Sequence, residues 1–283
     1  MHKRIPFLLA LALATPAIAG ETQYTESLES VLTMRIDGEI EVAADGHVKS
    51  HKLNTELPPE IRTPVDKAIG AWRFAPPTMD GKPVEAAIGK MRIALVASQR
   101  DDKNYVLKIE NVVFNEAATQ AASSPPQVSR DITIASKRSM PRFRASANVL
   151  VSMLFHIDPN GAVLDVAPTQ CTVLAIAPAQ DPTVACKTLE RESVIALRNW
   201  KFNVAKGGDG QPVDAMMGVF FSRDGSSSVL EPGKWRRELR SAYRPAPWAK
   251  ADDPRMGTSD VTDGGLQQPY AGLKLEEGIG KIL

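Results

Sequence analysis

The chain has 283 residues, of which 43% are hydrophobic, and its 34 Lys and Arg against 33 Asp and Glu give a formal net charge of +1. This length and composition fit two small domains with their own cores, plus extensions. The near-zero charge gives no electrostatic basis for nucleic-acid binding, so that class of function is disfavoured.

The first 20 residues have the pattern of a secretory signal peptide. Lys3 and Arg4 form a basic start, an apolar run follows from Phe7 to Ala14, and small residues end the segment near Ala19. The apolar run is shorter than the ~20 residues that a membrane-spanning helix needs. We therefore expect a cleaved signal and a periplasmic protein, with a retained membrane anchor as the alternative.

A hairpin is predicted at the start of the first domain, residues 31–97. Alternating apolar and polar residues from Ile36 to Val42 predict a strand with one buried face, and Asp45-Gly46 predicts a tight turn. The return strand, through residue 53, places His47 and His51 on one face. Same-side positions lie ~7 Å apart and a lysine stands between them, so solvated side chains are favoured over a metal site. We expect no cofactor.

A helix is predicted after this hairpin. Thr63 is its expected cap and Pro64 its first residue, and an apolar stripe ends at Trp72. Trp72 and Phe74 are interpreted as core residues rather than as a ligand cage. A final strand from Met91 to Val96 completes the predicted domain.

Residues 98–147 form a predicted connector. Tyr105 to Phe114 is rich in β-formers and is expected to add a strand to one of the sheets, whereas residues 117–130 have the Ala, Ser and Pro content of a flexible linker. A basic cluster follows, which we interpret as a solvated approach segment: Lys137, Arg138, Arg142 and Arg144.

The second predicted domain, residues 148–222, has the same order of elements. Its first strand, Val149 to Ile157, is continuously apolar, which predicts cover on both faces, with the connector strand as the candidate cover. A tight turn ends at Gly161, a helix is expected to begin at Thr188, and Ala215 to Phe221 is the last strand. His156 is interpreted as structural. The glycines of residues 207–210 are interpreted as a turn, because no Lys-Ser/Thr follows them.

Two cysteines, Cys171 and Cys186, lie in a predicted insertion of this second domain. In an exported protein such a pair favours a disulfide, here expected to clamp the inserted loop. Two buried thiols are the alternative. A metal site is weaker still, because no histidine lies near the pair.

The segment from residue 223 to 283 is predicted to hold a short basic helix and then little fixed structure. Glu231 to Tyr243 is the predicted helix, and Trp235 and Trp248 are expected to pack it onto a domain. From Ala249 the chain is rich in Gly, Asp, Pro and Gln, a composition typical of disorder.

Both predicted domains carry three motifs in one order. The motifs are a turn with glycine, Trp-basic-Phe, and Gly-x-Pro-Val; they occur as Gly46, Trp72-Arg73-Phe74 and Gly81-Lys82-Pro83-Val84, and again as Gly161, Trp200-Lys201-Phe202 and Gly210-Gln211-Pro212-Val213. An ordered triple match predicts an internal duplication. The predicted fold is α+β, with two repeats of strand, hairpin, strand, helix and strand, each a small antiparallel sheet with a helix on one face.

Within this pattern, Phe155 to Val163 and Leu197 to Phe202 resemble the TonB C-terminal domain family, and both copies together cover about half of the chain. The resemblance implies a cell-envelope protein whose last strand exposes an edge, to which an extended peptide of an outer-membrane receptor adds. The edge residues that it implies are Met91, Arg92, Ile93, Ala94, Leu95 and Val96, and Ala215, Met216, Met217, Gly218, Val219, Phe220 and Phe221.

Three functions follow from these observations. The leading hypothesis is a periplasmic protein-binding module that uses one or both strand edges, or the groove between the copies, to hold an envelope partner. The second is a membrane-anchored energy transducer for outer-membrane transport, which the missing Pro-rich spacer disfavours. The third is an enzyme, but we find no nucleophile beside a base, no paired carboxylates and no metal-ligand spacing. We expect no enzymatic activity.

Overall fold

The computed structural model describes residues 27–79, 82–101, 104–119, 132–136, 147–178, 180–204, 210–222 and 231–250, and short pieces of the remaining chain at 257–258, 260–261, 266–267, 273–277, 279 and 283. Over these residues the fold is α+β, with mostly antiparallel strands and two helices, which confirms the predicted class. Neither of these helices is long and apolar enough to cross a membrane. The predicted signal peptide and the basic cluster lie outside the described residues, and so does the predicted linker from residue 120 on. Its first three residues, 117–119, are not a linker but the end of a strand, Tyr105–Thr119.

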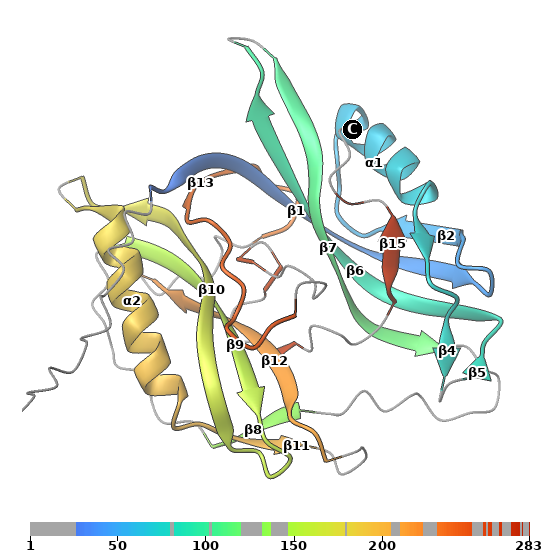
Figure 1. The fold of residues 1–283 in the computed structure, drawn as a ribbon. Coiled ribbons are helices and arrows are strands. Elements are labelled where there is room, and N and C mark those ends of the chain that lie inside the picture. The colour runs from blue at the N-terminus through green and yellow to red at the C-terminus, as the bar shows by residue number, and fades with distance from the viewer. Residues whose placement is uncertain are drawn as a thin grey trace, which may run out of the picture.

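A single sheet of nine strands runs through the described part of the chain (Figure 1). Its order is β14-β12-β9-β10-β13-β1-β6-β7, with β2 also pairing β1, and its pairs are antiparallel. The strands are β1 (Glu29–Ala43), β2 (Val48–Leu53), β6 (Ala86–Gln99), β7 (Tyr105–Thr119), β9 (Ala147–Ile157), β10 (Val163–Ile176), β12 (Val213–Phe221), β13 (Arg236–Arg240) and β14 (Leu266–Gln267).

Short strand pairs flank this sheet. They are β3 (Arg73–Phe74) with β15 (Leu275–Glu277), β4 (Thr78–Met79) with β5 (Lys82–Pro83), and β8 (Ile132–Ser136) with β11 (Lys201–Val204). The pair of β3 and β15 joins the first half of the chain to its C-terminal segment, which the composition predicted to lack structure. The segment holds strands because its apolar residues, such as Leu273 and Leu275, pack against the core of the first half.

Both helices begin earlier than the sequence prediction. Helix α1 (Pro59–Gly70) starts before Thr63 and contains Pro64, because Pro59 already supplies the fixed φ of a first turn. Helix α2 (Pro182–Leu197) starts before Thr188, because the side chain of Asp181 accepts a hydrogen bond from Thr183 N at 2.8 Å and caps the helix.

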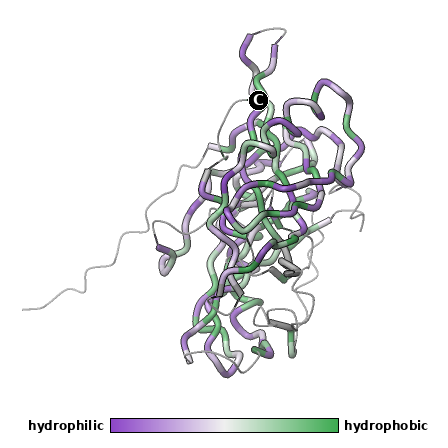
Figure 2. The backbone as a smooth tube through the Cα atoms, turned by 90° about the vertical axis from the view of Figure 1, so that its right-hand side faces the viewer, coloured by the Kyte–Doolittle hydropathy of each residue, from purple (hydrophilic) through white to green (hydrophobic). Residues whose placement is uncertain are grey.

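One face of the sheet carries two apolar cores, each under one helix. Trp72, Phe74 and Phe114 make edge-to-face contacts in the core that includes α1, and Phe155 makes one with Phe202 in the core that includes α2. The predicted core role of Trp72 and Phe74 is therefore confirmed. In side view, apolar stretches run through the middle of the molecule (Figure 2).

The same local contact fixes both hairpin turns. Gly46 and Gly161 each have φ +81°, and each accepts a hydrogen bond from the next motif along the chain: Phe74 N donates to Gly46 O at 2.9 Å and Phe202 N donates to Gly161 O at 2.8 Å. A Cβ on either glycine would lie 2.0 Å or less from the phenylalanine carbonyl oxygen. The turn glycine and the Trp-basic-Phe motif are thus in physical contact in both halves.

The C-terminal segment covers part of the opposite face of the sheet. Leu150 and Leu154 of β9 pack there with Ala246 and Val261, and Val113 of β7 joins the same cluster. Strand β9 is therefore covered on both faces, partly by the connector strand, as its continuous apolar sequence predicted. The predicted helix from Glu231 to Tyr243 is wrong: this stretch contains β13, whose strand partners are β1 and β10.

Candidate functional site

The two predicted edge strands exist but differ in their surroundings. Met91 to Val96 lies in β6, which pairs with β1 along one side and with β7 along the other. The prediction of an open edge at these residues is wrong, because the connector strand β7 already occupies that edge. The residues that were expected to bind a partner there are interior to the sheet.

The outer edge of β12 is the remaining candidate. All nine residues of β12, Val213 to Phe221, pair with β9 on the inner side. On the outer side, the described residues supply partners at two positions, where Met216 pairs with Gln267 and Met217 with Leu266 of β14. The edge predicted at Ala215 to Phe221 is therefore at the margin of the sheet and is partly covered.

From Ala215 to Phe221, the residues of β12 are apolar on both faces. Met217, Val219 and Phe221 belong to the core that includes α2, whereas Met216 belongs to the cluster on the opposite face, with Phe220 packed against it. This double burial fixes the strand in place. A fixed strand offers its backbone N–H and C=O groups in a regular row, which is what a second strand requires.

A disulfide fastens the layer behind this edge. Cys171 of β10 and Cys186 of α2 are bonded, with their Cα atoms 5.9 Å apart, which confirms the predicted pair. The expectation that this disulfide clamps an inserted loop is wrong, because Cys171 lies in strand β10 and Cys186 in helix α2. The bond instead ties α2 to the sheet beneath it.

A buried polar network lies where the two halves meet, and sequence reasoning did not find it. Thr258 is its centre: its carbonyl accepts from Arg35 Nη2 at 2.5 Å, its N–H donates to Gln170 Oε1 at 2.9 Å, and its hydroxyl lies 2.5 Å from that of Thr172. These contacts join β1, β10 and the C-terminal segment. Burial, with Arg236 nearby, lowers the pKa of Arg35 to about 10, so its guanidinium stays charged at neutral pH.

Asp260 is fully buried at the edge of this network. Its carboxylate accepts from Gly257 N at 2.7 Å, and burial raises its pKa from 3.8 to about 6. A second ionic link crosses between strands nearby, where both guanidinium Nη atoms of Arg240 lie 2.7 Å from the two oxygens of Glu110. The only sequence signal for this region is the polar Thr33 and Arg35 within the largely buried strand β1.

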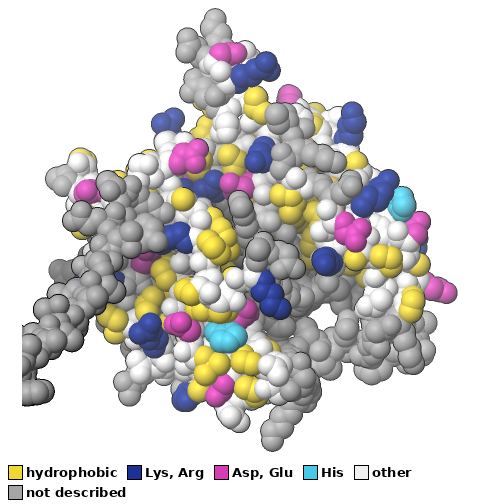
Figure 3. Space-filling view, in the orientation of Figure 1, with side chains coloured by type: hydrophobic (Ala, Val, Ile, Leu, Met, Phe, Trp, Pro, Cys, Tyr) yellow, Lys and Arg dark blue, Asp and Glu magenta, His cyan; other side chains and the backbone are white. Residues whose placement is uncertain are grey.

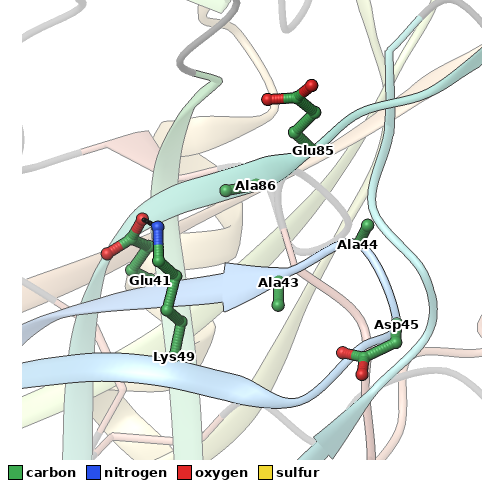
Figure 4. Close-up of a pocket in the computed structure, with 7 residues that line it drawn as sticks. All are labelled: Glu41, Ala43, Ala44, Asp45, Lys49, Glu85 and Ala86. Carbon is green, nitrogen blue, oxygen red and sulfur yellow. Dashed lines mark hydrogen bonds and ion pairs between the residues drawn. The ribbon is translucent and has the colours of Figure 1, made fainter.

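A shallow hollow lies at the far end of β1, β2 and β6, and it offers no converging ligand set. It is lined by Glu41, Asp45, Lys49 and Glu85 among others. Lys49 Nζ donates to Glu41 at 2.8 Å, and the three carboxylates are spread around the hollow rather than directed to one point (Figure 4). Over the part of the chain that the structure describes, no group of three or more His, Cys, Asp or Glu could hold a metal ion.

The histidines of the described chain have local partners. His51 Nε2 lies 2.9 Å from Asp66 Oδ1, and His47 Nδ1 lies 3.2 Å from Asp45 Oδ1. His156, interpreted as structural, lies 2.8 Å from Asp214 Oδ1 and packs near Trp248. On the face of the molecule seen in Figure 3, charged side chains of both signs are interspersed, in keeping with the small net charge.

Comparisons of the chain with protein-family models, with curated proteins and with solved structures found no match. The arguments for function therefore come from the sequence and the geometry described above.

Proposed function

We propose that this protein is a binding module of the cell envelope that takes up an extended segment of a partner protein by strand addition at β12. The observation that carries the proposal is the difference between the two sides of this strand. The inner side pairs at nine positions and the outer side at two within the described chain. An incompletely paired edge on a rigid strand is a template for another chain.

We also propose that the chain arose by tandem duplication of one strand, hairpin, strand, helix and strand unit. The paired contacts of Gly46 with Phe74 and of Gly161 with Phe202 support this, since two unrelated hairpins have no reason to share one contact at one place. In the second copy the last strand is at the margin of the sheet. In the first copy β7 has closed the corresponding edge, so one binding edge per chain is proposed rather than two.

Site-specific photo-crosslinking tests the site. A photoreactive phenylalanine analogue, p-benzoylphenylalanine, would replace Phe220, which is partly buried on β12, or Val184, which is 59% exposed on α2 and is a matched control. We expect an envelope protein to be captured from position 220 and not from position 184. Equal capture from the two positions, or capture from 184 alone, would overturn the site.

Proline substitutions test the mode of binding. In a strand, the N–H groups of successive residues point to opposite edges, so of two neighbouring prolines one removes an outward donor and the other an inward one. We expect one of Gly218→Pro and Val219→Pro to keep a cooperative thermal transition and yet lose capture. If the variant that stays folded also keeps full capture, strand addition is wrong.

A further inference from the structure

The two halves of the sheet meet at the ladder between β1 and β13. This ladder, which we call the joint, pairs five residues of β1, Glu29 to Thr33, with β13. Strand β13 also pairs with β10 at two positions, and its Leu239 packs against the core that includes α2. Ser241, the next residue after β13, forms hydrogen bonds with β10 through both its backbone N–H and its hydroxyl. Strand β13 is therefore fastened to the second half, and the joint is the place at which the halves can separate.

Apolar packing is concentrated on either side of the joint rather than across it. Over the described residues, the core that includes α1 and the core that includes α2 have no residue in common. From the first half, Leu28 packs against the second core, and Val113 joins the cluster on the opposite face of the sheet. Interfaces with few apolar contacts open at a lower free energy than the cores beside them. The joint is an interface of this kind.

Two charged side chains of β13 are buried at the joint. Those of Arg236 and Glu238 are 11% and 3% exposed, and Arg236 Nε lies 3.8 Å from Glu238 Oε1, beyond hydrogen-bond distance. Among the described residues, none of the three guanidinium nitrogens of Arg236 has a hydrogen-bond partner. The same holds for Glu238 Oε2 and for the hydroxyl of Thr33, which is the residue opposite Arg236. Buried polar groups without partners destabilise the arrangement that buries them, so the closed joint is less stable than its backbone pairing alone implies.

Arg35 adds a second buried guanidinium near this pair. Burial and then repulsion by Arg236 lower the pKa of Arg35 to about 10. Its Nη2 donates to Thr258 O, whereas its Nε has no hydrogen-bond partner among the described residues. Because the two like charges repel each other, moving β13 away from β1 relieves the repulsion and lets water reach both groups.

We propose that the joint opens and closes as a unit while each half stays folded, with β13 remaining on the second half. In the closed state, the five strand pairs and the contact of Arg240 with Glu110 hold one continuous sheet. In the open state, Arg35, Arg236 and Glu238 are hydrated, and β1 and β13 present unpaired margins to each other. This inference goes beyond the proposed binding edge and does not depend on it, because β12 lies on the far side of the second half.

Hydrogen exchange of the unmodified protein tests the opening, and β1 carries its own control. Successive amides of a strand point to opposite neighbours, here β13 on one side and β6 on the other. We expect the amides of residues 29–33 that are bonded to β13 to exchange at least tenfold faster than those of residues 32–36 that are bonded to β6. Protection that agrees within twofold on the two sides of β1 would overturn the inference.

A pair of leucine variants tests the cause of the opening. Arg236→Leu removes the buried guanidinium and keeps an apolar side chain in its place, so we expect the β13-bonded amides of β1 to exchange at least fivefold more slowly. Arg237→Leu makes the same change at the neighbouring exposed position and should leave these rates within twofold of the unmodified protein. Unchanged or faster exchange in a folded Arg236→Leu variant would show that the buried charge does not favour opening.

A disulfide across the joint gives a test that leaves Arg236 in place. Leu32 and Arg237 are directly opposite each other in β1 and β13, so Leu32→Cys combined with Arg237→Cys brings two thiols within bonding reach. We expect the oxidised double variant to protect the β13-bonded amides as well as the β6-bonded ones, and each single variant to keep the fast exchange. Fast exchange that persists in the oxidised double variant would mean that these amides exchange without separation of β1 from β13.

Discussion

Gly46 and Gly161 show how single positions fix the hairpins. Each has a positive φ, which costs a side-chain-bearing residue roughly 1–2 kcal/mol. Each also lacks room for a Cβ because a phenylalanine carbonyl lies against it. Gly210 has a φ of +72°, but no heavy atom of the described residues lies within 4 Å of its ideal Cβ position. It therefore separates the cost of the positive φ from the cost of the close contact.

We expect Gly161→Ala and Gly46→Ala to destabilise the protein more than Gly210→Ala does. Alanine at 210 carries only the backbone strain, whereas at 46 or 161 the hairpin must also move away from Phe74 or Phe202. Urea unfolding of the three variants measures the difference in free energy. Equal losses for all three would mean that the contact with the phenylalanine carbonyl has no energetic weight.

Asp260 makes stability depend on pH. Its folded pKa of about 6 lies above its ordinary value of 3.8, so its contribution to stability is fully present below pH 3.8 and is lost as pH rises through 6. The shift corresponds to a loss of at most about 3 kcal/mol. We expect Asp260→Asn to be more stable relative to the unmodified protein at pH 8 than at pH 4.

Urea unfolding at pH 4, 6 and 8 checks this prediction. Glu39→Gln, at an exposed position of β1, is the matched control and should leave the pH dependence unchanged. A difference between Asp260→Asn and the unmodified protein that stays constant over this range would show that the buried carboxyl is not the titrating group.

Residue-level reasoning succeeded where the signal is local. The tight turns follow from the residue types at the turns, and the core role of the aromatic residues follows from the tendency of aromatic side chains to be buried. The disulfide follows from the oxidising compartment expected for an exported protein. It failed for Arg35, Gln170 and Thr258, because their partners lie between 88 and 223 residues apart in sequence. Nothing near Thr258 in the sequence indicates that its backbone will satisfy a buried arginine.

At the scale of elements, the disulfide between β10 and α2 is a structural tie. Closing a loop of this length is worth about 3 kcal/mol in the chain-entropy estimate. We expect the double variant Cys171→Ala and Cys186→Ala to lose roughly that much stability. A reductant should destabilise the unmodified protein and leave the double variant unaffected, and urea unfolding with and without it makes the comparison.

The stretch that the sequence misassigned as a helix shows how tertiary context decides the type of an element. The stretch from Glu231 to Tyr243 has no strong periodicity, and its basic residues suit the surface of a helix. It forms β13 because an open position exists between β1 and β10, with hydrogen-bonding groups on both sides. Tertiary context of this kind overrides a weak local preference.

At the scale of the whole molecule, β13 makes one sheet out of two halves. Arg240 pairs in register with Glu29 of β1 and with Thr172 of β10, and its side chain reaches Glu110 of β7. The predicted arrangement of two separate small sheets did not include this strand. It could not be predicted from the motifs, because β13 carries none of them.

We expect Arg240→Ala to destabilise the protein by about 1.5–3 kcal/mol, the range for a hydrogen bond to a charged group, because the Arg240 side chain is 7% exposed but that of Glu110 is 35% exposed. Lys234→Ala is the matched control. It removes an ion pair with Glu231 whose two side chains are 72% and 48% exposed, and such pairs contribute about 0–1 kcal/mol. Calorimetry measures both, and similar small losses would show that the joint between the halves does not depend on Arg240.

The position of β13 also has a consequence for the order in which the protein is made. The strand that joins the halves is encoded after both of them, and it pairs with Glu29 near the start of the described chain. Neither half can complete its hydrogen bonding until Arg236–Arg240 has been synthesised, so the long-range closure follows the synthesis of both halves. A nascent chain stopped before Arg236 would present two open sheet margins at once, which is a recognisable substrate for chaperones and proteases.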